Sequence, residues 1–218
     1  MLLENRNYSK MKPLEIEKGK KFLGITLNLG TARLSLHLRA KPTYPTLGIL
    51  SRVPNTPYHV IFADYDNILR SVVIQDLKWA IENYHLTPFY LFATRETYYP
   101  QALPEEQYVG NYHAICLTKV TFHEAYEILS KLHIEPNYLK AVLASEYKAW
   151  VLRVIPKANL PSPRLIAVIL GDKPNLDREI SNAHLQFLLK YYKVPTIPYH
   201  KPDSSQEIEV VSYTTAKD

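Results

Sequence analysis

The stretch Tyr58-His-Val-Ile-Phe-Ala-Asp-Tyr-Asp-Asn-Ile-Leu69 decides the fold, because it joins an apolar run directly to two acidic side chains. The run Val60–Ala63 is uninterrupted, which is typical of a buried β-strand. Asp64 and Asp66 follow at its carboxyl end. Residues i and i+2 of an extended chain point the same way, so both carboxylates are predicted on one face of a sheet.

Paired carboxylates at the end of a strand suit a hard divalent cation, Mg²⁺ or Mn²⁺, which takes oxygen ligands and keeps waters for substrate phosphates. The alternative interpretation is an Asx-rich turn that ends the strand and caps the helix after it. The apolar run that precedes Asp64 and Asp66 makes a metal site as plausible as a turn.

Length and composition indicate a soluble globular protein with one core, or one core with an appended hairpin. The chain has 218 residues, of which 46% are hydrophobic and 22% charged. A net charge of +5 and a pI of about 9.1 fit a nucleic-acid or nucleotide partner without requiring one. The single cysteine, Cys116, favours a reducing, cytoplasmic compartment, and we expect no membrane segment. Only 6 glycines against 16 prolines would suit a thermophile.

The chain divides into three predicted parts: an N-terminal segment with a β-hairpin packed on the core (residues 1–57), a core ending in a helix (58–200) and a polar tail (201–218). The hairpin strands are predicted at Phe22–Leu27 and Ala32–Ala40, joined by a turn that contains Gly30. Four prolines predict a loop over Lys41–Pro57.

Within the core, strand-like runs alternate with helical spacing. The predicted strands are Tyr58–Ala63, Phe89–Ala93, Tyr112–Leu117, Trp150–Ile155 and Leu165–Leu170, the predicted helices are Leu69–Tyr84, Thr121–Leu132 and Ile180–Tyr192, and Thr97–Val109 is predicted as a loop. This order predicts an α+β fold with an RRM-like βαββαβ core, a mainly antiparallel sheet, helices on one side, and strand and helix additions at the C-terminus.

His113 is the third member of the candidate site. The strand that it opens can lie beside the strand of Asp64 and Asp66, which would bring the imidazole to the same surface as the carboxylates. Enzymes that transfer phosphoryl groups use acidic side chains to bind a metal ion, and an imidazole can bind a triphosphate. The alternative is a histidine that is hydrogen-bonded at a loop edge.

The motifs Ala63-Asp64-Tyr65-Asp66 and Asn111-Tyr112-His113 resemble those of the archaeo-eukaryotic primase superfamily. The resemblance covers Tyr58–Lys157 and implies an RRM-like catalytic core, template-directed nucleotide polymerisation and Mg²⁺ or Mn²⁺. It also implies a single-stranded template and nucleotides as partners, with a replication protein as a further one.

The chain departs from that family at two points. Asn111 stands where the family usually has serine, and no third acidic residue is evident on a later strand. Glu146 and Asp172 are the candidates for this third acid, and we assign Glu146 to the metal site with Asp64 and Asp66. Without a third acid the fold would persist without polymerase activity.

Four further residues are candidates for nucleotide and phosphate binding. Arg153 lies inside an apolar strand, where arginine is rare unless it is paired, so it is either a phosphate clamp or half of an ion pair. Lys157 follows that strand, and Thr94 and Arg95 end the strand that begins at Phe89.

Two other functions remain open. The segment around Asp64 also resembles the first motif of haloacid dehalogenase-type phosphatases, which implies Asp64 as nucleophile, Asp66 as acid/base, Thr94 as the later hydroxyl and Asp172 as a magnesium ligand. Ile68 replaces the customary threonine of that motif, and the reading requires a parallel sheet. The third hypothesis is a non-catalytic nucleic-acid-binding protein on an RRM-like fold. The rings on which its bases would stack come from a cluster of tyrosines, namely Tyr84, Tyr90, Tyr98, Tyr99, Tyr108 and Tyr112.

Overall fold

The structure, a computed structural model, describes residues 22–29, 32–38, 43–145, 148–154, 162–195, 197 and 210–216, with side chains from residue 48 to residue 197 of these ranges. The chain forms two compact units, residues 46–213 and residues 1–45 with 214–218. The fold is α+β, and the pairs β1–β2, β3–β7, β4–β6, β5–β6 and β5–β8 are antiparallel. No helix in the described part of the chain is long and apolar enough to cross a bilayer.

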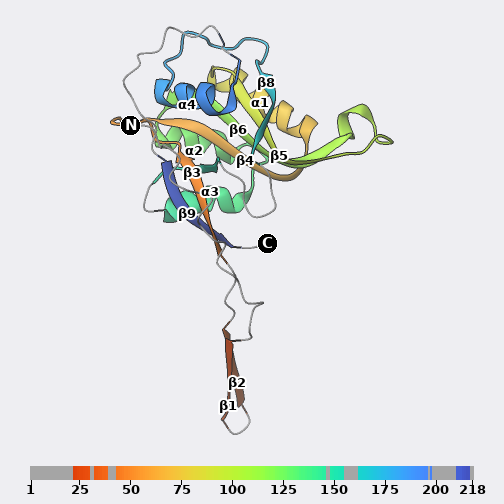
Figure 1. The fold of residues 1–218 in the computed structure, drawn as a ribbon, viewed down its shortest axis with the longest axis vertical. Helices are drawn as coiled ribbons and strands as arrows, with labels where there is room; N and C mark the ends of the chain where they lie inside the picture. The colour runs from red at the N-terminus through yellow and green to blue at the C-terminus, as the bar shows by residue number, and fades with distance from the viewer. Residues whose placement is uncertain are drawn as a thin grey trace. The chain divides into compact units, whose positions relative to one another are not determined.

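The elements follow one another along the chain as shown in Figure 1. The strands are β1 (Phe22–Leu29), β2 (Ala32–Leu38), β3 (Thr43–Leu50), β4 (His59–Leu69), β5 (Phe89–Tyr98), β6 (Tyr108–Val120), β7 (Val151–Arg153), β8 (Arg164–Ile169) and β9 (Val210–Ala216). The helices are α1 (Arg70–Tyr84), the 3₁₀ helix η2 (Pro104–Glu106), α2 (Phe122–Ser130), α3 (Pro136–Ala144) and α4 (Asn182–Tyr192).

The larger unit is built on a four-stranded sheet with the order β4-β6-β5-β8. β4 pairs with β6, and β6 with β5, so the strand of the acidic pair lies beside the strand of His113 as predicted. β8 pairs with the free edge of β5. The apolar run Val60–Ala63 is fully buried in this sheet, which confirms it as a core strand.

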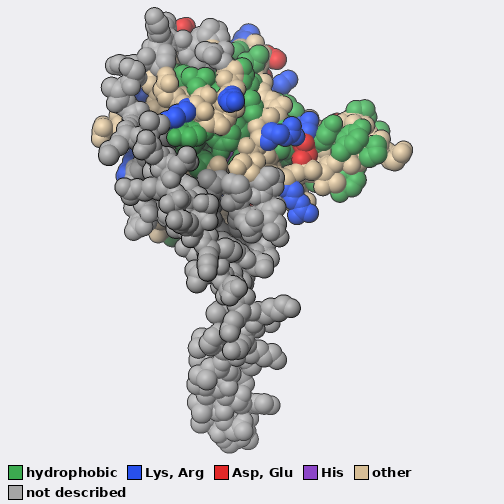
Figure 2. All heavy atoms as spheres, viewed as in Figure 1, with side chains coloured by type: hydrophobic (Ala, Val, Ile, Leu, Met, Phe, Trp, Pro, Cys, Tyr) green, Lys and Arg blue, Asp and Glu red, His purple; other side chains and the backbone are tan. Residues whose placement is uncertain are grey.

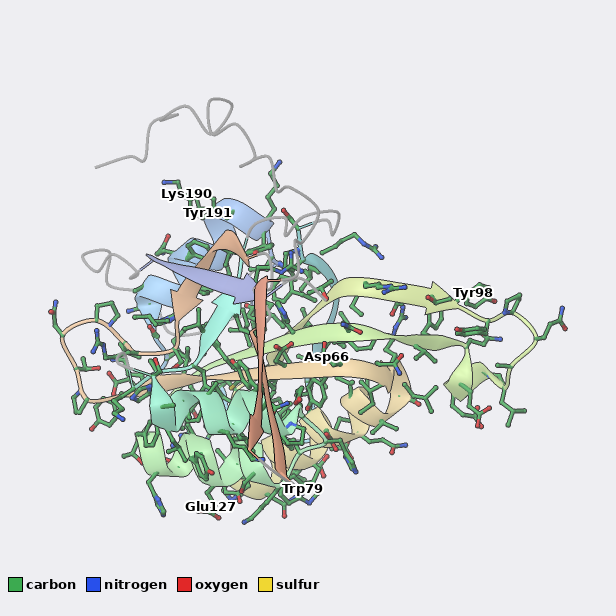
Figure 3. The ribbon with its side chains drawn as sticks, turned by 90° about the horizontal axis from the view of Figure 1, so that it is seen from below. Asp66, Trp79, Tyr98, Glu127, Lys190 and Tyr191 are labelled. Atoms are coloured by element: carbon green, nitrogen blue, oxygen red, sulfur yellow. The ribbon has the colours of Figure 1, made fainter. Side chains whose placement is uncertain are left out.

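The two faces of this sheet are covered by different elements. α1 and α2 lie on one face, where the side chains of Val73, Leu77 and Ile128 join the core (Figure 3). α4 lies over the other face, and the ring of its His184 meets Phe62 edge to face at 5.7 Å. Thr121 caps α2, because its hydroxyl accepts a hydrogen bond from the Glu124 amide.

The structure differs from the sequence predictions about strands at four places. The segment predicted as a proline-rich loop contains β3. This strand pairs with β7 through residues Gly48–Leu50, which follow Pro45. β7 was expected in the core sheet but belongs to a second sheet with the order β7-β3-β9. The loop predicted over Thr97–Val109 is shorter than expected, since β5 runs to Tyr98 and β6 begins at Tyr108. The tail also contains a strand, β9.

The N-terminal hairpin is confirmed, with β1 and β2 antiparallel from Phe22↔Leu38 to Leu29↔Ala32. Its predicted packing on the core stays a prediction. Residues 1–21 lie outside the described residues.

Buried histidines help to hold the two sheets together. Ser51 bridges the sheets, because its amide donates to the Trp150 carbonyl and its carbonyl accepts from the Val60 amide, both at 2.8 Å. The Ser51 hydroxyl lies 3.1 Å from His59 Nδ1. His184 Nε2 donates to the Leu50 carbonyl at 2.8 Å. Burial lowers the pKa of His59 and of His184 to about 4, so both rings are neutral at neutral pH.

These histidines predict a loss of stability in mild acid. Because their folded pKa values lie below the usual 6.5, the unfolded chain binds more protons as the pH falls from 6.5 towards 4. The free energy of unfolding should fall over that window by up to about 1.4 kcal/mol per pH unit for each histidine. Urea unfolding at several pH values between about 5 and about 7.5 measures this slope.

His184→Gln should reduce the slope by one histidine's share, whereas the exposed control His123→Gln should leave it unchanged. A wild-type stability that stays constant across the window would contradict the prediction.

Candidate functional site

Asp64 and His113 are directly opposite each other on β4 and β6. Opposed residues of an antiparallel pair point to the same face, and His113 Nε2 lies 3.4 Å from Asp64 Oδ1. The Asp64 side chain is 29% exposed and that of His113 is 10% exposed. The acid therefore reaches solvent while the imidazole beside it is nearly enclosed.

Asp66 is two residues further along β4 and is exposed to solvent. Its charge acts on His113 and favours the protonated form of that ring, which places the carboxylate near the imidazole. Figure 3 labels Asp66 on β4, in the middle of the larger unit. The structure thus brings Asp64, Asp66 and His113 together, as the sequence predicted.

Arg153 joins this cluster from β7 although that strand lies in the other sheet. It is 8% exposed, and together with His113 it lines a small cavity with room for about one water molecule. Tyr192 of α4 lines the same cavity, and its hydroxyl donates to the Val154 carbonyl at 3.2 Å.

The cluster holds its histidine in the neutral form. Burial is the main reason that the pKa of His113 falls to about 3, the positive charge of Arg153 lowers it further, and Asp66 opposes both effects. Burial likewise raises the pKa of Tyr192 to about 12, with Arg153 acting in the opposite direction. A neutral imidazole keeps one N–H to donate and leaves the two acids as the negative groups of the site.

Two β-bulges flank the site, one between Tyr65 and Ile68 of β4 and one between Ala93 and Arg95 of β5. Bulges bend strands and re-aim side chains, often beside functional sites. Asn67 lies in the first bulge at φ 49°, a left-handed conformation that asparagine tolerates, and its amide donates to Asn111 Oδ1 at 3.0 Å.

Asn111 therefore fixes the chain next to Asp66, a role that the sequence analysis did not predict. The sign of this contact in the sequence was Asn67, which directly follows the Asp64-Tyr65-Asp66 motif and tolerates a left-handed conformation.

The other predicted site residues are distributed as follows. The Thr94 hydroxyl donates to the Asn111 carbonyl at 3.2 Å. Asn111 is on β6, next to the strand of the acids, and Thr94 is one strand further away on β5. Arg95 is exposed at the second bulge. Asp172 follows β8 beyond the pair Phe89↔Ile169, at the end of the sheet opposite to Asp64. It therefore does not supply a third acid to this cluster. Glu146 and Lys157 lie outside the described residues.

The described residues include no group of three or more histidine, cysteine, aspartate or glutamate side chains set to hold a metal ion. Two carboxylates nevertheless fit Mg²⁺ or Mn²⁺, because Mg²⁺ is commonly held by one or two carboxylates, waters and substrate phosphates. Glu135 is a neighbouring acid that the sequence analysis missed. Its amide donates to the Asp64 carbonyl at 3.1 Å, while its carboxylate accepts from the Asn137 amide and caps α3.

Comparisons with known proteins give no match: no family model matches the chain, and neither a curated protein nor a solved structure does. The function is therefore argued from the geometry of the cluster.

The hydrogen bond between Asn67 and Asn111 predicts how the bulge that follows Asp66 responds to mutation. Asn111→Ala removes the acceptor of the Asn67 amide and should lower the free energy of unfolding by about 1 kcal/mol. Hydrogen exchange of the Asn67 amide should become faster in this variant, as measured by NMR. Asn111→Asp keeps an acceptor oxygen and should retain most of the protection. Equal protection in wild type and Asn111→Ala would show that the bond does not hold the turn.

Proposed function

We propose that the protein is a primase/polymerase-like nucleotidyltransferase that acts on a single-stranded nucleic-acid template with Mg²⁺ or Mn²⁺. The observation that carries the proposal is the meeting of Asp64 and Asp66, which follow the buried run within β4, with His113 of the neighbouring strand. Arg153 adds a buried positive charge to the same cluster. These are the residues on which the resemblance to the archaeo-eukaryotic primase superfamily rests.

The order of the core elements supports an RRM-like core. β4, α1, β5, β6 and α2 follow one another in the chain, and the strands lie in the order β4-β6-β5 with both helices on one face (Figure 3). The fourth position differs, since β8 extends the sheet beside β5 and β7 pairs with β3 instead. We therefore propose an RRM-like core with a rearranged final strand.

In this proposal each side chain has a separate task. Asp64 and Asp66 hold the divalent ion, which when bound neutralises charge on the phosphates of a nucleotide. His113 is neutral, so its N–H donates to a phosphate oxygen without adding a charge. Arg153 supplies the positive charge from the enclosed side of the cluster. A reducing, cytoplasmic setting and a replication-protein partner belong to the same proposal.

The dehalogenase-type phosphatase receives less support from the geometry. That interpretation requires a parallel sheet through the strands of Asp64, Thr94 and Asp172. Here β6 lies between β4 and β5, β8 is antiparallel to β5, and Asp172 is at the far end of the sheet. Binding of nucleic acid without catalysis is the second candidate, and the exposed tyrosines described below favour it.

A template-extension assay tests the proposed activity. The protein is incubated with a single-stranded template, labelled nucleotides and either Mg²⁺ or Mn²⁺, and labelled product is measured. Asp64→Asn and Asp66→Asn should each reduce incorporation by about 100-fold or more, because each removes a charge that the reaction requires. Mn²⁺ binding in the presence of a nucleoside triphosphate, measured by electron paramagnetic resonance, should weaken in the same variants.

Asp172→Asn is the matched control, since it makes the same change at the other end of the sheet and should leave incorporation unchanged. Circular dichroism verifies that each variant is folded. Absence of incorporation by the wild type with either metal would overturn the proposal, and phosphate release that depends on Asp64 and Asp172 would establish the phosphatase instead.

A further inference from the structure

The paired ends of β5 and β6, with the turn between them, form an arm (residues 95–111) that projects from the larger unit (Figure 1). Its turn carries the short helix η2. Hydrophobic side chains cover much of the arm, and Lys and Arg side chains lie at its base (Figure 2). Tyr98 is 52% exposed, Tyr99 49% and Leu103 60%. Large apolar side chains gathered in solvent mark an interaction surface.

The structure divides the tyrosine cluster of the sequence analysis into three groups, of which one, Tyr84 and Tyr108, is half-buried. Tyr90 and Tyr112 are fully buried and serve the core. Tyr98 and Tyr99 are exposed, and Figure 3 places Tyr98 far out on the arm. Only such exposed rings offer a face to a ligand.

Contacts at its base make the arm rigid. Arg70, the first residue of α1, forms a two-point ion pair with Glu96, with Nη2 to Oε2 at 2.5 Å and Nε to Oε1 at 2.8 Å. The Tyr112 hydroxyl donates to the same carboxylate at 2.8 Å, and the Arg70 guanidinium stacks 3.7 Å from the centroid of the Tyr108 ring. Gly110 permits the close crossing, since a Cβ there would lie 2.2 Å from the Arg95 carbonyl oxygen. The arm is thus pre-organised, which reduces the entropy cost of binding.

Two arginines beside the arm are available to an anion. Arg95 is on β5, and Arg164 begins β8 in register with Ala93. Both are exposed, and neither guanidinium group makes a hydrogen bond or ion pair with another residue in the described ranges. Tyr98 lies three residues beyond Arg95, about 10 Å along the strand and on its opposite face, where its ring lies 4.9 Å from that of Tyr108. Arg95 pairs with Asn111, the residue that holds the chain beside Asp66. Arg95 therefore shares the face of the acidic cluster, and the ring of Tyr98 lies further out along the arm on its other face.

We infer that this arm binds single-stranded nucleic acid, with bases stacked on Tyr98 and Tyr99 and phosphates against Arg95 and Arg164. A single strand offers base faces that stack on exposed rings and phosphates that bind guanidinium groups. A duplex keeps its base faces covered. The inference specifies the template site of the proposed function, but binding by the arm needs neither the metal nor the reaction.

Fluorescence anisotropy with a labelled single strand of about 20 nucleotides, in EDTA and without nucleotide, tests the arm alone. Tyr98→Ala and Tyr99→Ala should each weaken binding about 5- to 100-fold. Tyr191→Ala is the matched control, because Tyr191 is 56% exposed on α4, away from the arm, and its loss should leave the affinity unchanged. Arg95→Gln and Arg164→Gln should each reduce the slope of log affinity against log salt by about 0.7 to 1.

Variants of the acidic residues in the arm's turn distinguish a nucleic-acid ligand from a basic protein ligand. Glu105→Gln and Glu106→Gln should tighten strand binding, because each removes a negative charge near the phosphates. Weaker binding in these variants would overturn the inference, as would equal affinity of wild type and Tyr98→Ala. Sedimentation that shows a dimer lost on Tyr98→Ala would assign the arm to a second copy of this chain instead.

Tyr98→Ala and Tyr99→Ala should retain wild-type Mn²⁺ affinity in the presence of a nucleoside triphosphate. A protein that binds strands through the arm but incorporates no nucleotide would support this inference while the proposed activity fails. A protein that extends templates independently of Tyr98 and Tyr99 would support the activity and overturn this inference.

Discussion

The antiparallel pairing of β4 with β6 is the interaction on which the site depends. Val60–Ala63 is completely buried, and a slip of one residue would exchange the side chains that face α1 and α2 with those that face α4. Such a slip is expensive, since each large apolar side chain contributes about 1.5–3 kcal/mol when buried. The hydrophobic core therefore fixes the register that sets Asp64 opposite His113. The site needs no separate device to align its acid with its imidazole.

The core does not fix the chain beyond Tyr65, where the strand leaves the regular ladder. The bulge there is held by polar contacts, with Asn67 in a left-handed conformation and its amide bonded to Asn111. Asp66 lies between the regular strand and this turn, so its position depends on both. Thr94 bonds to the Asn111 carbonyl from the other side, which links the bulges of β4 and β5 through one residue of β6.

The parts predicted correctly from the sequence are those in which local pattern and burial agree. β4, α1, α2 and α4 each have a continuous apolar run or a helical stripe, and the adjacency of Asp64 and His113 follows from pairing the first and third strands. β3 was missed because prolines dominate its segment, although the pairing with β7 uses only residues after Pro45. The arm was missed because it lies largely in solvent and lacks the alternation that marks a half-buried strand.

β7 was recognised as a strand, but its partner was decided by packing rather than by its three residues. Arg153 reaches His113 even so, because the β3–β7 pair brings it to the histidine's side of the core sheet. Its enclosed charge has a physical consequence for the acids. If His113 were protonated, two cations would face Asp64 and Asp66, and their attraction for a divalent ion would be largely cancelled. Burial keeps the imidazole neutral well below neutral pH, so two acids and one arginine leave the cluster net negative. The enclosure of His113 is therefore what makes the exposed side of this cluster suitable for a cation and its enclosed side suitable for an anion.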